Sequence, residues 1–322
     1  MDKFEEFDGV ESFFNEVIKT HGNEDFEDYL CAVISTDQVD THGHCLTINA
    51  LKKAETSINS KGLPLNAHHD PRIPPFGKTI AAKLITSRDG TKNFLFGVLA
   101  TFKKEFYKPF PEIPHNSSYC AKISDFLTEP VEIEFSDVEI DDSIIMGAVD
   151  AAPDFVASKV IKVARKAADP ITILSFAIPG FIVYPFIKSY MSALGKDAAE
   201  LQKRFISWVI ESFAKKLKRR VLYSFKSPYR GCQVDFVVET DKPQHLTTAL
   251  ETVQKTGITA QYLIDYLIDK EPVELVYIYD IDTENWIPSY LKTAKGEIST
   301  DKPYLMSLEQ FGGVSIGAKL IE

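Results

Sequence analysis

The sequence predicts an α+β protein of two domains, a β-rich module over residues 1–150 and a helix-rich α+β module over residues 151–322. The chain of 322 residues is longer than most single domains. Apolar and polar residues alternate in much of the first half, as in strands that bury one face. Residues 196–220 instead repeat apolar side chains every three or four positions, as in an amphipathic helix. The change of pattern near Asp150 marks the predicted boundary.

The composition is that of an ordinary globular protein, with 44% hydrophobic and 25% charged residues. The net charge of −10 argues against nucleic-acid binding, which normally needs a basic surface. The four cysteines show no paired spacing, and the acidic first residues lack the apolar core of a signal peptide. We therefore expect a cytoplasmic protein with reduced thiols and no nucleic-acid partner. The sequence does not predict an oligomeric state.

Within the β-rich module, local signals predict strands with two helices among them. Gly62 is a typical residue just beyond a helix end, and Asp89-Gly90 is a strong hairpin signal. The predicted elements are helices over 10–20 and 47–60, and strands over 29–35, 78–87, 93–102 and 131–140, the last with a break near Ser136.

The second module begins with a helix predicted over 156–168 and an uncharged run of 17 residues, 171–187. That length lies between a buried core helix and a membrane-spanning helix, and Pro179 and Pro185 would disturb a helix in either setting. We expect an apolar helical segment over 171–194 that is buried or faces a partner, with membrane contact as the alternative.

The amphipathic helix over 196–220 ends in a basic stretch, and cations are favoured at a helix C-terminus. Beyond it the pattern predicts an α+β arrangement. The expected elements are strands over 233–240 and 273–279, helices over 244–254 and 259–268, and a hairpin made of 285–291 and 296–300.

Chemistry-bearing residues concentrate in the first module, where five of the seven histidines fall between positions 42 and 115. His68, His69 and Asp70 are consecutive and are followed directly by Pro71. Because the residue before a proline avoids helical geometry, Asp70 is predicted to be extended or in a turn. A second polar segment, 35–45, reads Ser-Thr-Asp-Gln-Val-Asp-Thr-His-Gly-His-Cys.

Three short motifs between Ala32 and Thr101 carry a family resemblance. They are Ser-Thr-Asp-x-Val-Asp-x-His-Gly, a Pro-Leu strand that leads to x-His-Asp, and Pro-Pro-Phe-Gly-Lys. This stretch, less than a quarter of the chain, resembles the tailed-phage prohead (capsid maturation) proteases, whose barrel is similar to that of the herpesvirus assemblins. The resemblance implies a barrel-like fold for residues 1–150 and a phage-related serine peptidase that acts on a protein or peptide substrate, with His69 as general base.

The nucleophile is less clearly marked. The family carries its serine in a strand resembling Phe-Ser-x-Gly-Phe, and residues 100–145 contain no such string. Ser117 and Ser118 are the nearest serines by position, whereas Ser315, in Gly-Val-Ser-Ile-Gly, matches the motif. In a Ser–His site the imidazole accepts the hydroxyl proton as the oxygen attacks a carbonyl.

A third group would have to orient His69. Asp70 follows it directly on extended backbone and so points to the opposite face, which leaves His68 or a distant carboxylate for this role. The peptidase hypothesis requires no cofactor.

Two alternatives use the same residues differently. One is a non-catalytic binding or effector protein that keeps the barrel without its triad and contacts a membrane or a partner protein through 171–194. The other is a zinc protein, because imidazole, thiolate and carboxylate are all zinc ligands. Its candidate ligands are His42, His44, Cys45, His68, His69 and Asp70.

Overall fold

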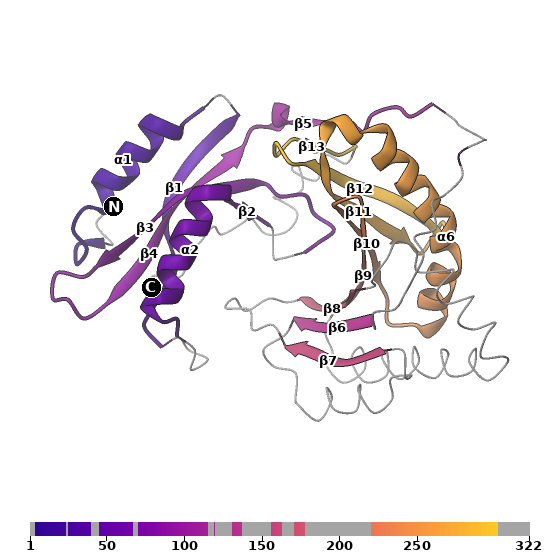
Figure 1. Cartoon of the computed structure of the whole chain (residues 1–322), viewed down its shortest axis with the longest axis horizontal. Coiled ribbons are helices and arrows are strands. Elements are labelled where there is room, and N and C mark those ends of the chain that lie inside the picture. The colour runs from indigo at the N-terminus through magenta and orange to yellow at the C-terminus, as the bar shows by residue number, and fades with distance from the viewer. Residues whose placement is uncertain are drawn as a thin grey trace. The chain divides into compact units, whose positions relative to one another are not determined.

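A computed structural model of the chain is an α+β protein with two sheets, which confirms the predicted fold class (Figure 1). It forms two compact units, residues 4–66 with 74–107 and residues 70–73 with 108–301. Among the residues described, no helix is both long and apolar enough to cross a membrane. The described residues are 4–23, 25–39, 45–66, 70–114, 119, 131–136, 156–162, 171–177 and 220–301.

The first unit is built on a four-stranded sheet of order β1-β4-β3-β2, in which every neighbouring pair is antiparallel. Thr47 caps the second helix with its side chain, and Gly62 ends it at φ 71°, in the left-handed region that favours glycine. The elements of this unit are α1 (Val10–His21), β1 (Phe26–Thr36), α2 (Ile48–Lys61), β2 (Leu63–Leu65), β3 (Gly77–Thr86), β4 (Asn93–Phe102) and the 3₁₀ helix η3 (Lys104–Phe106).

The two helices cover opposite faces of this sheet and give three layers (Figure 1). Phe13 of α1 packs in a cluster with Ala81 of β3, and Leu51 of α2 packs in another with Ala82. Consecutive strand residues point to opposite faces, so neighbouring alanines serve different layers. Each layer buries the apolar stripe of one helix.

The barrel-like closure implied by the family resemblance is not shown by the described part of the chain. Its strands form an open sheet with β1 and β2 at the two edges. Apolar residues occupy both faces of β3 and β4, so both faces need a cover. Helices α1 and α2 provide that cover.

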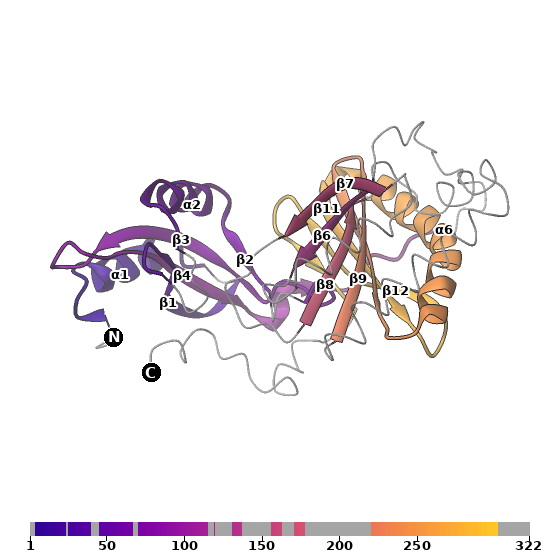
Figure 2. The ribbon, with the colours of Figure 1, turned by 90° about the horizontal axis from the view of Figure 1, so that it is seen from below.

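The second unit is built on a nine-stranded mixed sheet of order β5-β13-β12-β11-β10-β9-β8-β6-β7 (Figure 1). Figure 2 shows β6, β8 and β9 of this sheet, with helix α6, from below. The chain passes from the first unit to the second within β5. The elements are β5 (Tyr107–Lys108), β6 (Val131–Ser136), β7 (Val156–Lys162), β8 (Ile171–Ala177), β9 (Arg220–Tyr229), β10 (Cys232–Glu239), α6 (Pro243–Tyr266), the 3₁₀ helix η4 (Ile268–Lys270), β11 (Pro272–Asp280), β12 (Asn285–Thr293) and β13 (Ile298–Ser299).

Helix α6 packs against β10, β11 and β12. Trp286 Nε1 donates a hydrogen bond to the Ala249 carbonyl at 3.1 Å, and the Trp286 ring lies edge-on to Phe236 and Tyr279. The sequence predicted two helices here, and the structure has one. Gly257 does not interrupt it, because this buried glycine lies on the apolar stripe between Val253 and Ala260.

Two helix predictions in the second unit are wrong where the structure describes them. Val156–Lys162, predicted as helix, is strand β7, and Ile171–Ala177, the start of the predicted apolar helical segment, is strand β8. Strand β8 pairs with β6 on one side and β9 on the other. A short apolar run suits an interior strand as well as a buried helix, and periodicity alone does not separate them.

The other predictions for this region fall elsewhere. The rest of the apolar segment, 178–194, lies outside the described residues, as does the boundary predicted near Asp150. Of the amphipathic helix predicted over 196–220, only Arg220 is described, and it begins β9. The described part of the second unit contains one α-helix and many strands, so its predicted helix-rich character is not shown.

Candidate functional site

Most of the predicted site residues lie outside the described part of the chain. Two of the candidate zinc ligands are described: Cys45 is exposed, and Asp70 is buried in the second unit. The residues outside the described ranges are His42, His44, His68, His69, Ser117, Ser118 and Ser315.

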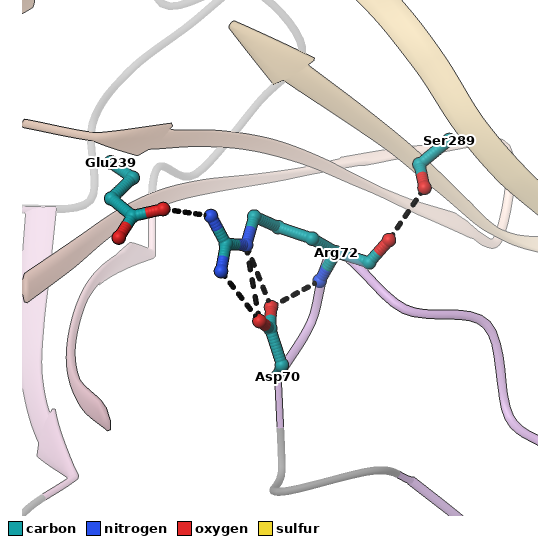
Figure 3. A network of polar contacts seen from close by, with 4 residues as sticks. All are labelled: Asp70, Arg72, Glu239 and Ser289. Atoms are coloured by element: carbon teal, nitrogen blue, oxygen red, sulfur yellow. Dashed lines mark hydrogen bonds and ion pairs between the residues drawn. The ribbon is translucent and has the colours of Figure 1, made fainter. Parts of the chain in front are cut away.

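Asp70 is held by Arg72, two residues further along the chain (Figure 3). Asp70 Oδ1 accepts hydrogen bonds from the backbone N–H and from Nε of Arg72, both at 2.9 Å. Asp70 Oδ2 accepts one from Arg72 Nη2 at 2.7 Å. The N–H of Ile73 also donates to the Asp70 carbonyl at 3.1 Å, which closes a turn with Pro71 in its second position. Asp followed by Pro is a favoured start for such a turn.

Arg72 fastens this turn to two strands of the second sheet (Figure 3). Its Nη1 forms an ion pair with Glu239, the last residue of β10. Its carbonyl accepts a hydrogen bond from Ser289 Oγ of β12 at 2.6 Å. The turn is therefore anchored at both its side chain and its backbone.

Charge balance explains why these groups tolerate burial. The Asp70 side chain is 3% exposed and that of Arg72 is 17% exposed. Burial alone would lower the pKa of Arg72, but the hydrogen bonds and charges of Asp70 and Glu239 raise it above its usual value. A buried charge is stable only when it is paired in this way.

A second polar group lies on the strands beside this anchor. Tyr290 Oη donates to Glu274 Oε1 at 3.0 Å, and Lys292 forms an ion pair with the other Glu274 oxygen. Gln233 Nε2 donates to Asp235 Oδ1 at 3.0 Å. Burial, then the charges of Glu274 and Asp235, hold the pKa of Tyr290 well above its ordinary value. Tyr290 is thus a hydrogen-bond donor here and not a base.

These contacts limit what Asp70 can do. Both of its oxygens accept hydrogen bonds from Arg72, so a zinc ion or an imidazole would have to compete with a buried guanidinium. Among the described residues, no three His, Cys, Asp or Glu side chains are grouped so as to hold a metal ion. The zinc site stays a prediction about residues outside the described ranges.

A cluster that the sequence did not predict surrounds Asp265 near the end of α6. Its carboxylate accepts hydrogen bonds from Tyr119 Oη at 2.9 Å and from Tyr229 Oη at 3.1 Å. Arg230 Nη1 pairs with the same carboxylate at 3.2 Å. Burial, then the bond to Asp265, raises the pKa of Tyr119, so the phenol stays protonated as a donor.

The cluster continues to the surface of the second unit. The ring centroids of Tyr119 and Tyr262 are 4.9 Å apart, and Tyr262 Oη donates to the Pro114 carbonyl at 2.9 Å. Tyr266 is 49% exposed, Ile268 is 41% exposed, and the Arg230 side chain is 41% exposed. We call this group the tyrosine patch, which consists of Tyr119, Tyr229, Arg230, Tyr262, Tyr266 and Ile268.

Sequence signals for the patch existed. Tyr262 and Tyr266 are four residues apart on a helix, so they lie on the same face. Arg230 and Gly231 both have positive φ, at 48° and 82°, in the two-residue turn between β9 and β10. That turn places Arg230 outside the sheet. The sequence does not predict that this turn lies next to the end of α6.

Comparison of the chain with models of protein families, with curated proteins and with solved structures gives no match. The functional argument therefore depends on the chain's own residues.

Proposed function

We propose that this protein is a binding protein that recognises a partner protein through the tyrosine patch of the second unit. The observation that carries the proposal is the exposure of Tyr266 and Ile268, at and just beyond the end of α6, and of Arg230, which pairs with Asp265 of the same helix. Tyrosine and arginine, with tryptophan, are the residue types enriched among those that dominate protein–protein binding energy. A large aliphatic side chain beside them adds apolar area that a partner can cover.

The patch is also held rigid before any partner arrives. Asp265 fixes the phenols of Tyr119 and Tyr229 and the guanidinium of Arg230 through direct contacts. Less conformational entropy is lost on binding when the contact side chains are already ordered. This favours recognition by the existing surface over a surface formed on contact.

The chemistry of the patch suggests what the partner presents. The Arg230 side chain is 41% exposed, and its guanidinium has five N–H donors, of which the pair with Asp265 uses one group. A partner carboxylate can bind there while an apolar side chain covers Tyr266 and Ile268. We expect a partner segment in which an acidic residue lies next to an apolar one.

The test compares three versions of the full chain, each used as the bait in an affinity capture experiment. The first is the wild type, the second carries Tyr266→Ser and Ile268→Ser, and the third carries Val39→Ser at the 68% exposed Val39. Bound proteins are quantified by mass spectrometry, and melting temperatures confirm folding. The proposal expects a partner bound by the wild type and the Val39 variant and lost with the double variant. Identical sets for all three would reject it.

We keep the serine peptidase as a second candidate for one specific reason. Arg72 fastens Asp70 to the second sheet, and His69 is the residue directly before Asp70. Precise positioning of catalytic groups favours catalysis, and Asp70 is the described residue nearest to His69 in the sequence. The barrel-like module, and Ser118 or Ser315 as nucleophile, belong to this second proposal.

A fluorophosphonate probe tests the peptidase directly, because it reacts with an activated serine. The hypothesis expects labelling that is lost in His69→Ala and in either Ser118→Ala or Ser315→Ala. Full labelling of His69→Ala, or none of the wild type, would reject the peptidase and leave the binding proposal standing.

A further inference from the structure

Strand β1 lies at an edge of the first sheet and has a long apolar sequence. It runs for 11 residues and pairs with β4 on one side, and no described strand pairs with its other side. In an edge strand, alternate residues point their backbone N–H and C=O groups away from the sheet, which makes a template for another strand. Proteins often protect such edges with lysine or proline, and β1 contains neither.

The regular part of β1 lies between two irregularities. The pairing with β4 shifts register between Phe26 and Asp28 and again between Val33 and Ser35. Residues 28–33 between these shifts form a regular ladder. The side chains there are mostly apolar, and Leu30 is 37% exposed.

We propose that β1 pairs antiparallel with β1 of a second copy of the chain, about a two-fold axis at Cys31. The two four-stranded sheets then continue into each other through one shared interface. A two-fold axis makes the contact self-complementary, as in most homodimers. An axis at Cys31 keeps the contacting residues, 29–33, within the regular ladder of each copy.

The side chains agree with this register. Tyr29 lies opposite Val33 of the other copy, and aromatic and β-branched residues form favourable cross-strand pairs. In each copy, Tyr29, Cys31 and Val33 all pack against the cluster beneath α1, so they share one face of the sheet. Cross-strand neighbours must share a face, and this register meets that condition.

The charged residues of β1 favour antiparallel over parallel pairing of the two copies. Glu27 and Asp28 are the only charged residues of β1, and both lie near its beginning. Antiparallel pairing sets this acidic end against the uncharged end of the other copy. Parallel pairing would instead bring four carboxylates together, and like charges on adjacent strands are destabilising.

The test uses the full chain and needs no engineered cysteine. Light scattering after size exclusion should give a dimer, and copper-phenanthroline oxidation should link two chains through Cys31, identified by peptide mapping. Directly opposed residues in adjacent antiparallel strands have Cα atoms about 4.5–5.5 Å apart, within the range that a disulfide spans. The cross-link should disappear in Cys31→Ala, while the dimer remains.

Leu30→Lys should give a folded monomer whose melting temperature does not change with protein concentration, whereas that of the wild-type dimer should rise with concentration. Leu63→Lys, at a 44% exposed leucine on the opposite edge strand, should stay dimeric. A monomeric wild type overturns the proposal. So does a dimer linked through Cys45 or Cys232 but not Cys31, or one that Leu30→Lys leaves intact.

Discussion

Arg72 and Asp70, two residues apart in the chain, form a paired contact in which Nε and Nη2 of the guanidinium reach the two carboxylate oxygens, at 2.9 and 2.7 Å. Such bidentate pairs are among the strongest polar contacts in proteins. Here the pair joins a proline-rich turn to β10 through Glu239 and to β12 through Ser289. The tight turn is thus part of the second unit's sheet architecture.

Replacing Arg72 with Met should destabilise the second unit by about 3–5 kcal/mol, since the buried Asp70 carboxylate would lose its counter-ion. Chemical denaturation measures the change. The matched control is Arg88→Met, because Arg88 pairs with Asp8 at the surface, where the side chains are 63% and 74% exposed. That change should cost less than about 1 kcal/mol. Equal losses in the two variants would show that the Arg72 contact does not stabilise the fold.

Replacing Asp265 with Leu should both destabilise the second unit and weaken partner binding. Tyr229 is 9% exposed and would lose the Asp265 carboxylate that accepts its phenol O–H. The loss of a hydrogen bond to a charged group costs about 1.5–3 kcal/mol. Thermal unfolding measures the loss, and Asp269→Leu on the exposed turn is the control. Wild-type stability in Asp265→Leu would contradict the anchoring role of this carboxylate.

Gly77→Ala should destabilise the first unit by about 1–3 kcal/mol, the usual cost of overpacking a well-packed site. A Cβ at this position would lie 2.2 Å from the backbone oxygen of Ala100, so β3 and β4 would have to separate. Gly90→Asn is the control: nothing lies within 4 Å of its Cβ position, and asparagine tolerates the positive φ of 74°. If Gly77→Ala unfolds like the wild type in a denaturant titration, the close approach has no energetic role.

The sequence predicted the first unit well because its signals are local. The hairpin of β3 and β4 follows from Asp89-Gly90, and the end of α2 follows from Gly62. Gly77 belongs to the Pro-Pro-Phe-Gly-Lys motif, and the structure gives a separate reason for a glycine here: a Cβ would collide with the backbone of Ala100. The hairpin and the helix end each depend on a few neighbouring residues.

The second unit was predicted less well because its signals are distant in sequence. Strand β8 is recognisable only by its pairing with β6 and β9, which a single apolar run does not specify. The ion pair between Arg72 and Glu239 joins residues that are 167 positions apart in the sequence. No sequence pattern around either residue predicts this contact. The tyrosine patch likewise needs the β9–β10 turn to meet α6.

The stability of the folded chain should fall as the pH rises above about 9, because two thiols are harder to ionise in the folded state. Burial raises the pKa of Cys31 from 9.0 to about 11, and burial followed by the charges of Glu274 and Asp235 raises that of Cys232 to about 12. At a pH between 9 and about 11, both thiols are mostly deprotonated in the unfolded chain and mostly protonated in the folded chain. The folded state then binds more protons, so the free energy of unfolding decreases with pH.

Cys31→Ala separates the contribution of one thiol from the rest. Its unfolding free energy should decrease less steeply than that of the wild type between pH 9 and about 11, the range over which the Cys31 thiol titrates in only one of the two states. Urea unfolding at fixed protein concentration, repeated across this range, gives both slopes. Cys45→Ala removes an exposed thiol instead and is the control. Identical slopes for Cys31→Ala and the wild type would mean that the Cys31 thiol is not desolvated by folding.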